Sequence, residues 1–254
     1  MILFSSIVHL LIAHPGHELL LYGLISRNKP VVHILTDGTA HSSAARLGAT
    51  ASLLRDAGAT QGAIFGRLSD AEAYEMILER NTTLLLSLVM DLAAQLEKDQ
   101  PGILVADAAE GYNPAHDLCR LIAGAAIEMA GVPTKHYEYS VVNHPDSDGA
   151  AIAVDLNTAE YAAKMELARA QAASLGDIEA LVERYGAGAY RRETLRLVAD
   201  WTTIDDGEPP LYERYGEERV AAGQYVTVIR RREHMLPLRD ALRAAVMEKR
   251  LCAF

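Results

Sequence analysis

The chain has 254 residues, with 24 Lys or Arg against 34 Asp or Glu, so its formal net charge is −10. This length supports a sizeable core without disulfide bonds. An acidic surface repels phosphate backbones and anionic membranes, which argues against a nucleic-acid or membrane partner. Half of the residues are hydrophobic and 23% are charged, which is typical of globular proteins and excludes disordered and collagen-like classes.

Only two cysteines are present, Cys119 and Cys252, and they form no CxxC pattern. This usage is typical of a reducing compartment and predicts a cytoplasmic location. The first 13 residues are apolar but contain no Lys or Arg before the apolar run. They also form too short a segment to span a bilayer, so we interpret their later part as a buried strand.

Short apolar runs alternate with longer helical stretches through the first half of the chain. Continuous apolar runs are typical of strands buried on both faces, and their alternation with helices indicates a parallel sheet. The sequence therefore predicts an α/β fold, with a Rossmann-like, mostly parallel sheet flanked by helices. We expect strands at 7–13, 31–36, 63–65, 103–107 and 137–142, and helices at 18–27, 43–57, 71–98 and 114–130.

The pattern changes after a polar turn at residues 143–149. The remainder predicts a C-terminal α+β elaboration, at about 146–254, on a core of about 1–145, and the whole chain is expected to form a single domain. Within the elaboration we expect a hairpin or edge strand at 150–156, a helix at 158–184, a loop at 186–188, a strand at 225–230 and a helix at 238–250.

Polar side chains follow the predicted strands at the edge where α/β sheets bind ligands. His14 and His17 come after the first strand, and His116 lies in the loop region after the strand at 103–107. Three histidines match a catalytic zinc site that keeps a fourth position for water. Imidazole also suits iron, nickel or copper, so zinc is the first expectation and iron an alternative. A simpler interpretation is that His14 and His17 only cap a helix and bond locally.

Other reactive motifs are absent from the sequence. There is no GxGxxG after the first strand, no P-loop motif and no GxSxG elbow, which argues against the usual dinucleotide, nucleotide-triphosphate and serine-hydrolase sites. We interpret Cys119 as a buried thiol and His33 as a core histidine. No role is assigned to the other histidines considered, His136, His144 and His234.

The segment Ala13-His-Pro-Gly-His-Glu18 resembles the Ala-His-Pro-Asp-Asp-Glu motif of the PIG-L/LmbE family of zinc-dependent N-acetylglucosaminyl deacetylases. Three further features match that family in order and spacing over residues 6 to about 120, and residues 164–171 faintly resemble its later helix. These features are Thr36-Asp-Gly38, Arg46 with Ala57-Gly58, and the segment Gly111-Tyr-Asn-Pro-Ala-His116. The chain is thus similar to a divergent member of the family.

The resemblance implies that His14 and His116 are metal ligands and that His17 replaces the family's aspartate ligand. Gly16 stands where the family has its general-base aspartate, and glycine cannot accept a proton. Loss of a general base typically costs on the order of 10²–10⁴ in rate. Another group would have to substitute, and the candidates in nearby loops are Glu18, Asp37 and Asp117.

Each candidate also has a structural interpretation. Glu18 suits the first turn of a helix because of the helix dipole, and Asp117 could orient a ligating imidazole. Asn113 could donate to a developing oxyanion or cap the following helix. Arg46 and Asp70, together with Asp37, are expected to contact substrate as the resemblance implies, with solvated surface charge as the alternative.

The leading hypothesis is a metal-dependent hydrolase that cleaves an N-acyl amide of a small polar metabolite. One alternative keeps a three-histidine metal centre for lyase, isomerase or redox chemistry, and another is a non-catalytic binding protein on the same scaffold. We expect a small-molecule substrate as partner. A homo-oligomer is favoured only by the frequency of closed oligomers among such proteins.

Overall fold

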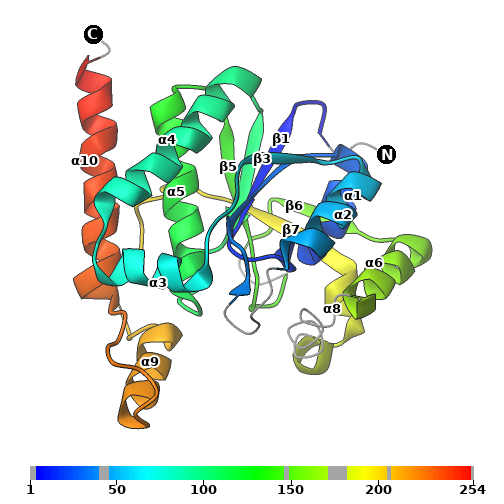
Figure 1. Ribbon diagram of the computed structural model, residues 1–254. Coiled ribbons are helices and arrows are strands. Elements are labelled where there is room, and N and C mark those ends of the chain that lie inside the picture. The colour runs from blue at the N-terminus through cyan, green and yellow to red at the C-terminus, as the bar shows by residue number, and fades with distance from the viewer. Residues whose placement is uncertain (1–3, 40–45, 146–148, 171–181, 205–206, 253–254) are drawn as a thin grey trace.

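The computed structural model describes residues 4–39, 46–145, 149–170, 182–204 and 207–252. Seven strands form one sheet in the order β3-β2-β1-β4-β5-β7-β6. The first five are parallel to one another, whereas β7 pairs antiparallel with both β5 and β6. Helices cover both faces (Figure 1), which confirms the predicted α/β fold with a mostly parallel sheet.

Three of the parallel strands, β1, β2 and β4, are apolar runs of the sequence, whereas β5 covers residues 135–139 and not the predicted 137–142. In β1 (Val8–Ile12) and β4 (Ile103–Asp107) every residue is buried, as a central strand covered on both faces requires. The other three are β2 (Val31–Thr36), β3 (Thr60–Leu68) and β5 (Lys135–Tyr139). In the register of the sheet, His9 of β1 lies opposite Val31 of β2, and Val8 of β1 lies opposite Ile103 of β4. The carboxyl ends of these parallel strands therefore meet at one edge.

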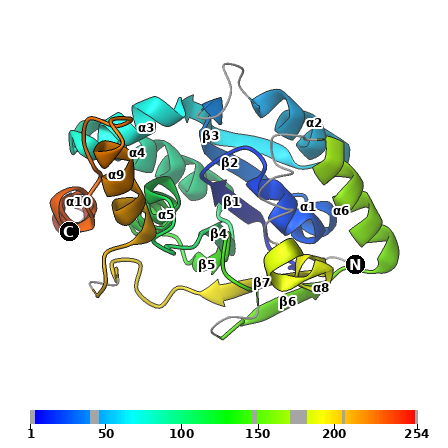
Figure 2. The same ribbon diagram turned by 90° about the horizontal axis from the view of Figure 1, so that it is seen from below.

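Two apolar clusters fill the space between the sheet and its helices. One joins the sheet to α4, α5 and α10, and the other joins it to α1, α2 and α6. The two views show these two sets of helices on opposite faces of the sheet (Figures 1 and 2). The bounds of these helices are α1 (Tyr22–Asn28), α2 (Leu47–Ala57), α4 (Thr82–Asp99), α5 (Pro114–Ala130), α6 (Thr158–Ala170) and α10 (Leu236–Cys252). No described helix is both long enough and apolar enough to cross a membrane.

The single helix predicted at 71–98 is wrong, because the chain forms α3 (Asp70–Leu78) and α4 there. Arg80, between the two helices, has a left-handed backbone with φ 52°. The Asn81 side chain then accepts a hydrogen bond from the backbone N–H of Leu84 and caps the start of α4. A local cap thus overrides a continuous apolar pattern.

The C-terminal part departs further from prediction. The expected edge strand is confirmed as β6 (Ile152–Asp155), but its partner β7 (Arg192–Leu197) was not predicted. The segment 225–230, predicted as a strand, has no strand structure, and the expected loop at 186–188 is partly α8 (Ala187–Arg191). The helix expected at 158–184 starts as α6, and its part at 171–181 lies outside the described residues. Helix α9 (Leu211–Ala221) and the π-helical turn η3 (Arg231–Met235) complete this part.

Candidate metal centre

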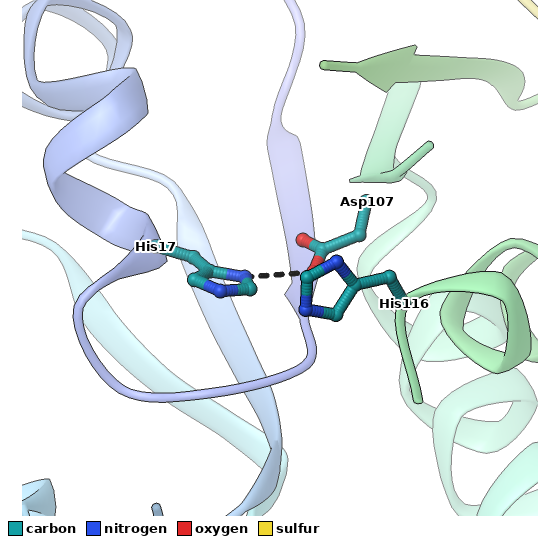
Figure 3. A group of neighbouring side chains, drawn as sticks. All are labelled: His17, Asp107 and His116. Atoms are coloured by element: carbon teal, nitrogen blue, oxygen red, sulfur yellow. Dashed lines mark hydrogen bonds and ion pairs between the residues drawn. The ribbon is translucent and has the colours of Figure 1, made fainter. Parts of the chain in front are cut away.

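Ligating side chains from three segments meet at the carboxyl edge of the sheet. His17 begins the 3-10 helix η1 (His17–Leu21) after β1, Asp107 ends β4, and His116 lies in the first turn of α5. One ligating atom from each of these residues lies within 4.8 Å of the other two, and Figure 3 shows the three side chains pointing toward one another. They form a group that could hold a metal ion.

The turn that carries the first two histidines is held in place by Glu18. Gly16 has φ 110°, a conformation that favours glycine. The Gly16 N–H donates to Glu18 Oε2 at 2.6 Å, and the Thr50 hydroxyl donates to Glu18 Oε1 at 2.7 Å. Glu18 is fully buried, so its carboxylate fixes the turn. Its predicted role as a base stays a prediction.

Asp107 orients His17. Asp107 Oδ2 accepts hydrogen bonds from His17 Nδ1 at 2.8 Å and from the Ala13 N–H at 3.1 Å, while Oδ1 accepts from the Tyr139 hydroxyl at 2.5 Å. Burial acts to raise the pKa of Asp107, but the charge and hydrogen bond of His17 outweigh it and hold the value at about 2. An ionised carboxylate only accepts hydrogen bonds, so His17 carries a proton on Nδ1, and the neutral form of His17 then has its lone pair on Nε2.

Asp70 plays the same part for His14. His14 Nδ1 lies 2.9 Å from Asp70 Oδ1 and 2.8 Å from Thr36 Oγ1, and the Thr36 hydroxyl donates to the Ala13 carbonyl. His14 therefore donates from Nδ1, and its Nε2 accepts from the Asn113 amide at 3.4 Å. Asp70 is only 3% exposed. Its carboxylate thus orients His14, and its predicted contact with substrate stays a prediction.

The three imidazole rings lie close together. Their centroids are separated by 5.4 Å for His14 and His17, 5.3 Å for His14 and His116, and 4.7 Å for His17 and His116. Three imidazoles bound tetrahedrally through nitrogen at zinc distances place their ring centres about 5 Å apart. His116 Nδ1 is buried and has no hydrogen-bond partner among the described residues. The ring spacing and this unpaired nitrogen suit a metal ion, but His14 is not one of the residues whose ligating atoms all lie within 4.8 Å of one another, which are His17, Asp107 and His116.

Burial keeps two of these imidazoles neutral. It lowers the pKa of His14, although Asp70 acts in the opposite direction. It also lowers the pKa of His116 well below the usual value, with a further contribution from His17. Metal ions bind the neutral form of histidine, so the rings need not lose a proton first at neutral pH.

Asn113 and Asp117 lie at the start of α5, on either side of His116 in the sequence. Asn113 caps α5 by accepting from the Ala115 N–H at 2.9 Å, as one of its two interpretations predicted, and its amide also reaches His14. Asp117 is 5% exposed and accepts from the Gly111 N–H at 3.1 Å. Burial raises the pKa of Asp117 to about 7. That value suits a group that exchanges protons near neutral pH.

Asp37 and Arg46 lie in the segment between β2 and α2. Asp37 Oδ1 accepts from the backbone and hydroxyl of Thr39, and Arg46 Nε donates to the Gly38 carbonyl at 3.0 Å. These contacts stabilise the loop. No contact between these two side chains and the histidine cluster is found in the described residues, and their substrate contacts stay predictions.

Sequence reasoning missed the part of Asp107. Asp107 is the final residue of a buried strand, and that position by itself does not distinguish a ligand from a structural carboxylate. Tyr139 was missed for a different reason, since only the pairing of β4 with β5 places its hydroxyl beside Asp107. Cys119 and His33 are fully buried, as predicted.

No protein-family model matches the chain, and no curated protein matches its sequence. The solved structure of the conserved protein TT1542 from Thermus thermophilus is 18% identical with a TM-score of 0.53, covering 80% of this chain and 99% of that one. The A40926 pseudoaglycone deacetylase Dbv21 is 15% identical with a TM-score of 0.46, over 77% of this chain and 98% of that one. The 4-carboxy-2-hydroxymuconate hydratase GalB from Pseudomonas putida KT2440 is 12% identical with a TM-score of 0.46, over 80% and 99%. The likeness to TT1542 shows that this chain shares its fold.

Proposed function

We propose that this chain is a metal-dependent hydrolase that cleaves the N-acyl amide bond of a small polar metabolite. The observation that carries the proposal is the meeting of His14, His17 and His116 at the ligand-binding edge of the sheet, with carboxylates behind two of them. The resemblance of residues 13–18 and 111–116 to the PIG-L/LmbE deacetylase motifs supports the amide as the bond cleaved.

The three imidazoles would hold the metal, with Asp107 as a further ligand or as the partner that orients His17. Nitrogen ligands at this spacing favour zinc, and iron is the alternative. When bound, a divalent metal supplies Lewis acidity, which polarises a carbonyl and makes water more acidic.

The chain's own residues account for orientation and proton transfer. Asp70 and Asp107 fix the tautomers of His14 and His17, an arrangement that raises ligand basicity. The Asn113 amide, 3.4 Å from His14 Nε2, is placed to donate a hydrogen bond to a substrate oxygen near that ring. Asp117, next to His116 in the first turn of α5, is our candidate for the missing general base, and its pKa of about 7 suits a group that accepts and returns a proton.

Elemental analysis of the purified protein tests whether the chain binds a metal ion. The metal content of the wild type is compared with that of His14→Ala, His17→Ala and His116→Ala. His234→Ala is the matched control, since His234 bonds locally to the backbone of Arg230. We expect near-stoichiometric zinc in the wild type and the control, and a loss of metal in the other three variants. Absence of metal after reconstitution would overturn the proposal.

A panel of N-acyl amides then tests the reaction. Release of amine should depend on the metal and should fall by about 10²–10⁴ in Asp117→Asn if Asp117 carries the proton. A metal-loaded protein that cleaves no amide, yet turns over another substrate class, would contradict the hydrolase assignment.

A further inference from the structure

Tyr74 of α3 contacts the residue that caps α5. Its hydroxyl donates a hydrogen bond to the side-chain oxygen of Asn113 at 3.3 Å. The same oxygen accepts from the backbone N–H of Ala115 at 2.9 Å. An amide has one accepting atom, its oxygen, and one donating group, its NH2. The two donors therefore hold the oxygen of Asn113 on their side, and the NH2 group lies on the other side of the amide.

That NH2 group faces the histidine cluster. The Asn113 side-chain nitrogen lies 3.4 Å from His14 Nε2. His14 donates from Nδ1 to the Asp70 carboxylate at 2.9 Å, so Nε2 of the neutral ring can only accept. The oxygen of the Asn113 amide thus meets two donors, and its nitrogen meets an acceptor. All of these partners agree on one orientation of the amide.

One side of α3 presents both groups that act on this arrangement. Asp70 and Tyr74 are four residues apart, a spacing that places two side chains on the same side of a helix. The Tyr74 ring is half-buried and packs against the apolar cluster between the sheet and α4, α5 and α10. Burial raises the pKa of Tyr74 to about 12. The hydroxyl therefore keeps its proton at neutral pH and can donate to Asn113.

We infer that Tyr74 is a positioning residue, which holds the Asn113 amide with its NH2 group toward the histidine cluster. The inference deepens the proposed function and rests on it in one respect, which is that this NH2 group donates to a substrate oxygen. A His14 Nε2 atom bound to a metal ion no longer accepts from Asn113, so the N–H becomes available to the substrate. A substrate group that is itself a donor is disfavoured there, because two facing donors leave each other unsatisfied.

NMR of the metal-free full chain tests the positioning role without any reaction. The side-chain amide of Asn113 is assigned as the signal that disappears in Asn113→Ser, since serine can still cap α5. In Tyr74→Phe this signal should move toward the position of an exposed amide, because one hydrogen bond to the oxygen is lost. Tyr161→Phe is the matched control, since Tyr161 lies on α6 and packs against the other apolar cluster. It should leave the signal in place.

Steady-state kinetics on an N-acyl amide that the protein cleaves test the consequence for the reaction. Tyr74→Phe should lower kcat by about twofold to tenfold, the usual effect of one neutral hydrogen bond. KM and the metal content should stay unchanged, because the bond from Asn113 strengthens in the transition state. Since Tyr74 acts through Asn113, Tyr74→Phe should have no further effect on kcat in a chain that already carries Asn113→Ser.

An Asn113 signal that does not move in Tyr74→Phe would overturn the inference, as would an equal loss of kcat in the presence and absence of Asn113→Ser. Melting temperatures show whether Tyr74→Phe folds, and Tyr74→Met, which also lacks the hydroxyl, replaces it if it does not. A moved signal in a protein that cleaves no amide would support the positioning role while the proposed function fails. Amide cleavage with an unmoved signal would show the reverse.

Discussion

Asp70 Oδ1 accepts a hydrogen bond from His14 Nδ1 at 2.9 Å, although the two residues are 56 positions apart in the chain. Asp70 lies in the first turn of α3 and His14 directly after β1, so docking of α3 at the sheet edge sets the tautomer of the ring. The His14 lone pair is thereby on Nε2, which would exchange its 3.4 Å hydrogen bond from the Asn113 amide for a metal ion on coordination.

Asp70→Asn should weaken zinc affinity by about 10-fold to 100-fold, the usual effect of removing a carboxylate behind a ligating histidine. A competition titration with a chromogenic chelator measures this affinity. Glu75→Gln is the matched control, because Glu75 is a carboxylate on the same helix that makes no side-chain contact with the cluster among the described residues. Equal zinc affinity in Asp70→Asn and the wild type would show that His14 is not a ligand positioned by Asp70.

Three buried histidines away from the cluster should make the fold sensitive to acid. Burial lowers the pKa of His9 to about 4 and those of His33 and His136 to about 3. Each folded pKa lies below the unfolded value of about 6.5, so the unfolded chain binds more protons between these values. The free energy of unfolding should therefore fall as the pH drops below about 6.5, by up to about 1.4 kcal/mol per pH unit for each histidine.

Urea titrations at pH 7, 6 and 5 measure this dependence, with His136→Phe as the comparison. His136 Nε2 is buried without a partner in the described residues, so an apolar ring there removes a titrating group without breaking a hydrogen bond of that atom. The variant should lose less stability than the wild type between pH 7 and pH 5. Parallel curves for the two proteins would contradict the assignment of a depressed pKa to His136.

Breaking the buried ion pair between Lys164 and Glu193, whose charged atoms lie 2.9 Å apart, should strongly destabilise the fold. Lys164→Met leaves the Glu193 carboxylate buried without its cation, and removal of one partner of such a pair typically costs about 3–5 kcal/mol. Chemical denaturation measures the loss. The double variant Lys164→Met with Glu193→Gln should recover much of it, since no charge then remains. A double variant no more stable than Lys164→Met would indicate that lost packing, and not the unpaired charge, is the cause.

Much of the core could be predicted because its signals are local. The apolar runs at 31–36 and 103–107 form β2 and β4 at the predicted residues, and Pro114 and Gly131 bound α5 as expected. The break at Arg80 is also local, since Asn81 is a good cap, but the apolar residues on both sides concealed it.

The C-terminal part was less predictable because pairing, and not periodicity, decides it. Residues 192–197 include charged side chains, yet they form β7 because β5 and β6 offer backbone partners on both sides. Residues 225–230 alternate like a strand but form none, and the structure gives them no strand to pair with among the residues it describes. Strand formation depends on neighbours that a single segment does not contain.

The sequence by itself determined the parallel sheet and the three histidines at its carboxyl edge, since buried strands need continuous apolar runs and the residues after them must meet. Only the tertiary structure decided which carboxylates serve those histidines. His14 pairs with Asp70 and His17 pairs with Asp107, which in turn accepts from Tyr139. Each partner comes from a distant segment of the chain. Hydrogen bonds of this kind depend on the angle and distance at which packed elements meet, and that geometry is set by the whole core.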